Sequence, residues 1–319
     1  MAEKVRIFHA VDVHGSEIVW RKWLSVPKVH KADILLLCGD LTGKLVVPVI
    51  EEKPGHYKTK IYGRWVKAKG EEGRKKLVDK ISSIGFYAHV CDPQEYEYLM
   101  NNPKEVNKLF QQYMRERLER WLDMIYEKLP ENVKVVVMPG NDDSFEIDEI
   151  IKKHEDRVIY PLNKAVKLCF DYEMLSFDWV NPTPWNTPRE APEEELWDKL
   201  QKLADYVSVD WNRVILNFHC PPFGTKLDLA PKLDKNLKPQ VFLGSVIYEH
   251  VGCKSVRKFI EEHQPMLGLH GHIHESYAAD RIGKTLVINP GSEYSEGILR
   301  GFIIDLTKDG VEKWWKIEG

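Results

Sequence analysis

The sequence has little of what marks secreted or membrane-embedded proteins. It contains no apolar stretch long enough to span a bilayer. The first residues, MAEKVRIFHAVDVHG, pass into a strand-like run without the apolar segment of a secretory signal. The five cysteines are an odd number, widely spaced and without a C-x-x-C pair, which argues against a disulfide scaffold. We therefore expect a soluble protein of the reducing cytoplasmic compartment.

The chain also lacks an excess of charge of either sign. Its 46 Lys and Arg residues face 49 Asp and Glu residues, which gives a net charge of −3. This balance argues against a protein that binds nucleic acid or anionic membranes through its overall charge, although it leaves room for a local basic patch. With 319 residues, of which 43% are hydrophobic, the chain can bury a large core.

Short apolar runs alternate with helical patterns along the chain. Runs of four to six mainly apolar residues predict strands at 5–10, 34–37, 133–138, 214–218 and 266–269. Amphipathic periodicity predicts helices at 16–24, 105–129, 192–206 and 245–263. This alternation indicates an α/β architecture, in which functional groups lie on loops at the carboxyl ends of strands.

We predict that residues 1–319 form a single domain with an insertion at about 44–131. The insertion contains a hairpin with Pro54-Gly55 near its turn, followed by the long helix at 105–129. From Tyr57 onward, basic and apolar side chains alternate. One interpretation is a basic flap that steers a phosphate-bearing substrate. The other is a half-buried strand with a solvated face, which this pattern more commonly marks.

Polar side chains follow the predicted strands where each strand ends. In D-x-H and H-x-H the two outer side chains point to the same side of an extended chain, so both can bind metal. Oxygen and nitrogen donors without a thiolate suit Mn, Fe, Zn or Co, and differ from a structural zinc site. The candidate metal ligands are two carboxylates, one amide and four imidazoles: Asp12, His14, Asp40, Asn141, His219, His272 and His274.

The ordered series D-x-H, G-D, G-N, H and G-H-x-H resembles the calcineurin-like metallophosphoesterase superfamily. The segments GDLTGK, NPTPW and NPGS resemble its Icc-related phosphoesterase branch. The resemblance implies a sandwich of two mixed β-sheets flanked by helices, rather than the simple parallel sheet that the alternation suggests. It also implies two divalent metal ions that Asp40 bridges, with the other ligands divided between them as follows: Asp12, His14 and His274 on the first, and Asn141, His219 and His272 on the second.

The function that this resemblance implies is hydrolysis of a phosphoester, with a nucleotide among the candidate substrates. Two cations roughly 3.5–4 Å apart can lower the pKa of a bridging water, whose hydroxide attacks phosphorus in line. A protein or small-molecule phosphomonoesterase and a nuclease stay open as alternatives, although the near-neutral charge disfavours a nuclease. A non-catalytic metal-binding scaffold is a further alternative, although a relative of that kind should have lost metal ligands.

One position departs from the family pattern. Most members have G-N-H-D or G-N-H-E at the third motif, whereas this chain has Gly140-Asn141-Asp142-Asp143. A carboxylate beside cations should be ionised, which makes it a poor proton donor and a poor neighbour for phosphate. We therefore expect phosphodiesters or activated esters to be preferred over alkyl monoesters, unless Asp142 points away from the site. Asp142 and Asp143 are the candidate catalytic residues.

Other polar residues have weaker signals. Arg189 and Trp185 are candidate substrate ligands in a proline-rich loop, because Arg pairs with phosphate and Trp can stack on a base. Ordinary loop packing explains them equally well. His9 and His270 are predicted to be interior or supporting histidines. The segment Asn289–Ser292 reads as a tight turn, and the resemblance suggests that it contacts the site.

Overall fold

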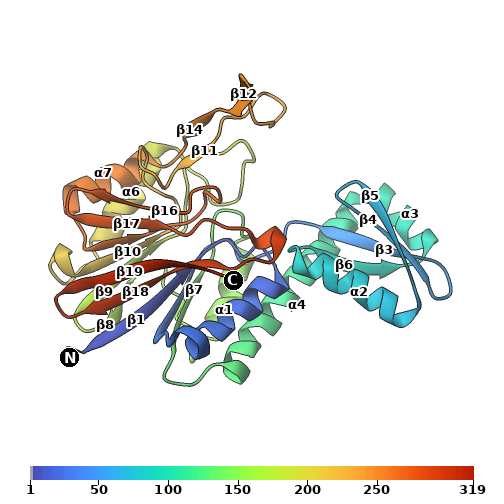
Figure 1. The fold of residues 1–319 in the computed structure, drawn as a ribbon, viewed down its shortest axis with the longest axis horizontal. Coiled ribbons are helices and arrows are strands. Elements are labelled where there is room, and N and C mark those ends of the chain that lie inside the picture. The colour runs from blue at the N-terminus through green and yellow to red at the C-terminus, as the bar shows by residue number, and fades with distance from the viewer. Residues whose placement is uncertain (1–2) are drawn as a thin grey trace.

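The computed structural model describes residues 3–319, and two mixed β-sheets form its centre (Figure 1). The first sheet has the strand order β19-β18-β1-β2-β7. In it, β1, β2 and β7 are parallel, whereas β18 runs antiparallel to both β1 and β19. The bounds of its strands are β1 (Lys4–Ala10), β2 (Ile34–Cys38), β7 (Lys134–Met138), β18 (Arg300–Thr307) and β19 (Gly310–Glu318).

The second sheet has the order β16-β17-β15-β10-β9-β8. Its four central strands are parallel, and an antiparallel strand closes each edge. The bounds of its strands are β8 (Ala165–Cys169), β9 (Tyr172–Phe177), β10 (Val214–Phe218), β15 (Leu267–Leu269), β16 (Ala278–Ile282) and β17 (Thr285–Asn289). Two mixed sheets replace the simple parallel sheet, as the family resemblance implies.

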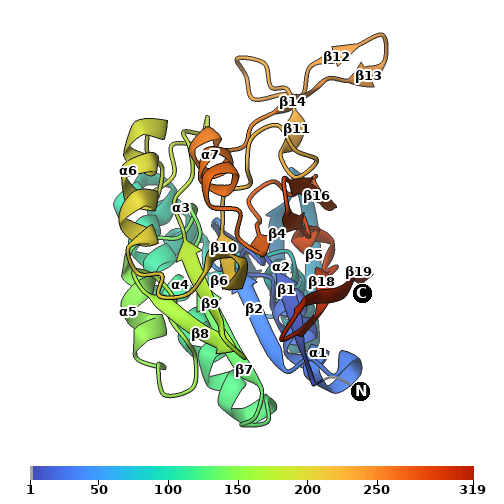
Figure 2. The ribbon, with the colours of Figure 1, turned by 90° about the vertical axis from the view of Figure 1, so that its left-hand side faces the viewer.

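Alternating side chains divide the core into layers. In β2, Ile34 and Leu36 belong to the apolar cluster between the sheets, whereas Leu35 and Leu37 pack against the helices outside. Helices α1 (Glu17–His30), α4 (Pro103–Lys128) and α5 (Glu146–Lys152) cover the outer face of the five-stranded sheet. Helices α6 (Glu193–Ala204) and α7 (Lys254–His263) cover the outer face of the six-stranded sheet (Figure 2). The result is a helix–sheet–sheet–helix sandwich.

The predicted elements agree with the structure to within two residues except at two ends. The helix predicted at 16–24 continues to His30 through Pro27. The helix predicted at 245–263 is wrong over its first half, because α7 begins only at Lys254. Residues 248–250 instead pair as a strand with residues 229–231. The helix then starts after Cys253, whose Sγ accepts a hydrogen bond from the Val256 N–H.

Residues 46–101 form a lobe that projects from the sandwich (Figure 1). The lobe has its own apolar cluster around Val49, Tyr57 and Ile81. Its hairpin turns at Pro54-Gly55, as predicted, and β4 buries alternate residues while Lys60 faces solvent. The half-buried strand is therefore the interpretation that the structure supports. The elements of the lobe are β3 (Val46–Lys53), β4 (His56–Ile61), β5 (Arg64–Lys69), α2 (Gly70–Ser83), β6 (Tyr87–Cys91) and α3 (Pro93–Asn101).

A second projection lies between β10 and α7. It consists of two small antiparallel sheets that extend away from the sandwich (Figures 1 and 2). Their strands are β11 (Leu229–Pro231), β12 (Val241–Phe242), β13 (Ser245–Val246) and β14 (Tyr248–His250). Among the helices of residues 3–319, none is both long and apolar enough to cross a membrane.

Two histidines are interior, as predicted. His9 and His270 have no exposed surface, and His9 Nε2–H donates to the His270 carbonyl at 2.9 Å. Burial lowers the pKa of His9 to about 4 and that of His270 to about 3, so both are neutral at pH 7.

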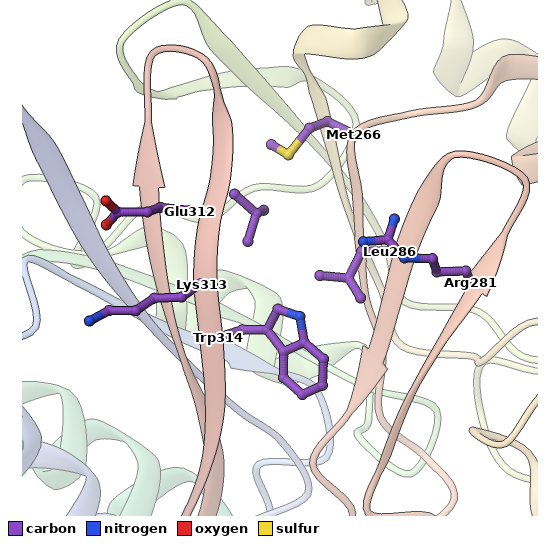
Figure 3. A pocket seen from close by; sticks show the side chains of 7 residues that line it. Met266, Arg281, Leu286, Glu312, Lys313 and Trp314 are labelled. Carbon is purple, nitrogen blue, oxygen red and sulfur yellow. The ribbon is translucent and has the colours of Figure 1, made fainter. Parts of the chain in front are cut away.

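A pocket of about 430 Å³ lies between the β18–β19 hairpin and the β16–β17 hairpin (Figure 3). Met266, Leu286, Val311 and Trp314 supply its apolar lining. None of the seven predicted metal ligands lines this pocket. The candidate site is therefore elsewhere, on the strand-end loops.

Candidate metal centre

The seven predicted metal ligands follow the carboxyl ends of five strands. The loops after β1, β2, β7, β10 and β15 meet at one edge of the sandwich, because parallel strands end on the same side of each sheet. Asp40 belongs to two groups of potential ligands, each with its ligand atoms within 4.8 Å of one another. One group is Asp12, His14, Asp40 and His274, and the other is Asp40, His219 and His272.

Four of these residues adopt left-handed backbone conformations. The φ angles are +52° at Asp12, +39° at His14, +52° at Asp40 and +68° at His272. Such angles cost on the order of 1–3 kcal/mol each for residues with a side chain, and they cluster at functional sites. The loops therefore turn sharply just after the strands, with local backbone strain as a consequence.

Two glycines allow the loops to come together. A Cβ atom on Gly39 would lie 2.2 Å from His219 Nδ1, and one on Gly140 would lie 2.3 Å from Asp40 Oδ1. Any side chain at either position would therefore displace a candidate ligand. This close approach explains why the sequence has glycine directly before Asp40 and Asn141.

Hydrogen bonds orient the second group. The His219 Nδ1–H donates to the Cys38 carbonyl at 2.8 Å, which directs Nε2 toward Asp40 Oδ2 at 3.5 Å and Asn141 Oδ1 at 3.0 Å. The Asn141 amide is fixed because its Nδ2 donates to Thr187 Oγ1 at 2.8 Å. His219 Nε2 and Asn141 Oδ1 are thus directed at the same point, an arrangement typical of ligands that share a cation.

Each carboxylate uses one oxygen for the backbone and presents the other to the cluster. Asp12 Oδ2 accepts from the His272 N–H at 3.0 Å, and Asp40 Oδ1 accepts from the Asp142 N–H at 3.0 Å. Within the described chain, the buried Asp12 Oδ1 has no hydrogen-bond partner. Asp40 Oδ2 lies 3.5 Å from His14 Nε2.

The electrostatics of the cluster require positive charge. Asp12 and Asp40 are buried carboxylates, and an uncompensated buried charge costs several kcal/mol. Burial lowers the pKa of His219, but Asp40 and Asp12 outweigh this effect and raise it well above its ordinary value. The donor types, the unpartnered acceptor and this demand for charge all fit divalent metal ions.

Asp143 corrects the prediction of a catalytic role. Its carboxylate accepts four hydrogen bonds, from the N–H groups of Gly140, Leu41 and Thr42 and from the Thr42 hydroxyl, at 2.6–2.9 Å. The side chain is fully buried. Asp143 therefore ties the Asn141 loop to the Asp40 loop and has no free oxygen for substrate.

Asp142 lies beside the cluster and pairs with Lys44, for which the sequence predicts no role. Its Oδ2 is 2.9 Å from Lys44 Nζ and 3.8 Å from His14 Nδ1. Burial and the nearby Asp40 charge raise the pKa of Asp142, and Lys44 opposes them. The carboxylate therefore does not point away from the site, and the Lys44 ammonium compensates its charge.

Arg189 packs between loops, which is the alternative to substrate binding that the sequence leaves open. Its side chain is 2% exposed, and the guanidinium pairs with Asp178 at 2.5 Å and Asp148 at 2.7 Å. It also donates to the Asp143 and Ser144 carbonyls. All of its donors are committed to neighbouring loops, so a phosphate group cannot reach it. Trp185 is 62% exposed, and its role in substrate binding stays a prediction.

The Asn289–Ser292 turn holds the loops that carry His272 and Asp12. Asn289 is fully buried, and its Nδ2 donates to the Gly271 and Ile273 carbonyls, which flank His272. The Ser292 hydroxyl donates to the Asp12 carbonyl at 2.7 Å. The contact with the site that the resemblance suggests is therefore present.

Comparison with known proteins identifies one relative by sequence. No family model matches the chain. The chain is 32% identical over 171 residues to the uncharacterized protein MJ1162 of Methanocaldococcus jannaschii, an alignment that covers 52% of this chain and 69% of that protein. The chain belongs to the same family as this archaeal protein.

Solved structures extend the comparison to the fold. One crystal structure matches at a TM-score of 0.57 and 16% identity over 99% of both chains. The protein TT1561 of Thermus thermophilus matches with a TM-score of 0.48 and a sequence identity of 14% over 99% of both chains. An archaeal phosphodiesterase matches with a TM-score of 0.41 and a sequence identity of 11% over 99% of this chain and 100% of that chain.

The sheet order and the first of these likenesses agree on the architecture. The chain shares its fold with the first of these structures, and its two mixed sheets flanked by helices are the architecture that the sequence resemblance implies. Assignment to the Icc-related branch stays a prediction.

Sequence reasoning missed two residues next to the cluster. Lys44 is the last residue of GDLTGK, so the motif itself was the signal. Tyr294 follows the Asn289–Ser292 turn, and its ring centroid lies 4.7 Å from that of His14 and 5.8 Å from that of His274. No sequence signal marks Tyr294, because its contact depends on a loop that returns from the far end of the chain.

The role of Arg189 can be tested by substitution. We expect Arg189→Met to lower the free energy of unfolding by about 3–5 kcal/mol, because it leaves the buried Asp178 carboxylate unpaired. Urea unfolding followed by circular dichroism measures the loss, with the exposed Trp185→Ala as control, where we expect a change within about 0.5 kcal/mol. Unchanged stability of Arg189→Met together with a raised KM would instead indicate substrate binding.

Proposed function

We propose that this protein is a metal-dependent phosphoesterase with two divalent metal ions that share Asp40. The observation that carries the proposal is the pair of donor groups joined by this one carboxylate, each compact within 4.8 Å. Mn, Fe, Zn and Co are the metals that this donor set favours. Asp12, His14 and His274 would hold one ion, and Asn141, His219 and His272 would hold the other.

Bound divalent ions would act as Lewis acids that make water a better nucleophile and offset negative charge on a phosphoryl group. The residues of the chain hold the ligand atoms in place and leave a side open for substrate. Hydrogen bonds to main-chain groups fix Asp12, Asp40 and His219, so their free atoms converge before substrate arrives. His274 keeps 29% of its side chain exposed, which places it at the open side of the cluster, where substrate can enter.

The Lys44–Asp142 ion pair distinguishes this site from the usual pattern of the family. In the position where most of the family has a histidine, the chain offers a carboxylate whose charge an adjacent ammonium compensates. Lys44 is near enough to the cluster to influence Asp12, Asp40, His14 and His274 electrostatically. We propose that Lys44 attracts the substrate phosphate while Asp142 disfavours a doubly charged one. This charge arrangement favours phosphodiesters and activated esters.

Two other functions use the same site. A phosphomonoesterase acting on proteins or small molecules would need the second negative charge of its substrate to be tolerated beside Asp142. A non-catalytic scaffold would bind metal without turnover, and the full set of seven donors argues against it, because loss of activity removes the pressure that keeps ligands.

The central expectation is metal-dependent turnover. We expect the metal-free protein to be inactive on a panel of phosphodiesters, phosphomonoesters and nucleotides, and Mn²⁺ to restore activity, with close to two metal ions bound per chain. Asp40→Asn should lower kcat/KM by roughly 100-fold or more, because it removes the shared charge. Asp171→Asn, the same change in an exposed turn, serves as control and should have no effect.

A metal-loaded protein that is inert on every member of this panel would favour the scaffold. Activity that survives both metal removal and Asp40→Asn would contradict the proposed chemistry.

Substrate preference tests the Lys44–Asp142 pair. We expect the wild type to cleave an aryl phosphodiester faster than an alkyl monoester. Asp142→Asn should raise kcat/KM for the monoester relative to the diester by about tenfold, because about 1.4 kcal/mol of repulsion is removed. Lys44→Met should lower kcat/KM on both, and more strongly on the monoester. A strong monoester preference in the wild type would contradict this account.

A further inference from the structure

The projection between β10 and α7 exposes an unusual amount of apolar surface. We call residues 229–250, from β11 through the β12–β13 hairpin to β14, the arm. Every residue from 241 to 250 is exposed, and at the hairpin tip Phe242 is 67% and Leu243 90% exposed. The large exposed apolar residues of the arm are Leu237, Val241, Phe242, Leu243, Val246, Ile247 and Tyr248. Exposed apolar side chains gathered on one projection are typical of an interaction surface.

The root of the arm is held rigidly. Asp228 is fully buried, and its carboxylate accepts hydrogen bonds from the N–H groups of Gly224, Thr225 and Gly252 at 3.0 Å each, and from His250 Nδ1 at 2.8 Å. The Ser276 hydroxyl donates to the Leu229 carbonyl at 2.9 Å. These bonds fix the direction of the arm, so it is a presented surface rather than a closing lid.

The outer half of the arm is held by main-chain hydrogen bonds within the arm, such as those that join Lys232, Gln240 and Ile247. Its β12–β13 hairpin is made of two residue pairs around a Leu243-Gly244 turn, and the views in Figures 1 and 2 show it standing clear of the sandwich. An isolated two-stranded hairpin is marginally stable in water. Each strand of the arm also belongs to a two-stranded sheet and so has one edge without a strand partner. Both properties indicate a surface that is completed by association.

We propose that the arm is the contact surface of a two-fold homodimer, in which a second copy of this chain covers Phe242, Leu243 and Tyr248. The exposed fractions of the seven apolar side chains, 37–90%, correspond to on the order of several hundred Å² per chain, a substantial part of the roughly 800 Å² that each partner buries in a standard interface. Free strand edges and apolar side chains are self-complementary across a two-fold axis, since the same patch serves both copies.

Charge on the arm favours a second copy over an anionic membrane. Its three lysines, Lys232, Lys235 and Lys238, face two acidic residues, Asp234 and Glu249. Lys232 lies 3.5 Å from Glu249, which leaves little free positive charge. Attraction to anionic lipids takes clusters of about four to eight basic residues. A nearly neutral apolar arm instead matches another arm of the same composition.

The oligomeric state in solution tests the proposal. We expect sedimentation equilibrium of the full chain to give the mass of two chains at micromolar concentration. The double variant Phe242→Ser/Leu243→Ser should weaken self-association by about 100-fold, because it removes the two most exposed apolar anchors. The control Tyr98→Ser/Met100→Ser, which changes comparably exposed residues on α3, should leave the dimer intact.

Thermal unfolding of both double variants checks that they are folded. A wild-type mass of one chain, or a dimer that survives the arm variant, would overturn the proposal. So would a monomer that binds vesicles of phosphatidylserine and phosphatidylcholine, because the surface would then serve a membrane. Failure of the dimer proposal would leave the proposed phosphoesterase activity unaffected, because turnover and mass are measured separately.

Discussion

The site depends on two carboxylates, Asp12 and Asp40, that are buried close together at one edge of a β-sandwich. Burying two negative charges is unfavourable unless positive charge lies next to them. Four imidazoles and an amide oxygen surround the carboxylates with further donors, and hydrogen bonds direct His219 and Asn141 inward, so that divalent cations fit as the source of the positive charge. The side chains therefore form a set of donors suited to divalent cations, in which Asp40 belongs to both compact groups.

The sandwich makes this arrangement possible in structural terms. Four candidate ligands adopt left-handed φ angles, each of which costs on the order of 1–3 kcal/mol. The large apolar core between the sheets holds the strand ends in place, and the Asp143 and Asn289 side chains tie neighbouring loops together. Core stability is thereby used to maintain a strained and preorganised edge.

The predictable features were local, and the unpredictable ones depend on distant parts of the chain. Strand 214–218 was predicted with its observed bounds, because five mainly apolar residues and the following His219 are enough to mark it. Residues 248–250 were predicted as helix and form a strand, because their partner strand at 229–231 is separate in sequence. For Arg189 the sequence leaves substrate binding and loop packing open, since nothing local reveals the buried Asp178 that pairs with it.

The most direct test of the two-ion account is a crystal structure of the protein grown with Mn²⁺, with anomalous differences measured at the manganese edge. The account predicts two anomalous peaks with Asp40 between them, one next to Asp12, His14 and His274 and the other next to Asn141, His219 and His272. A single peak, or peaks located away from Asp40, would contradict it.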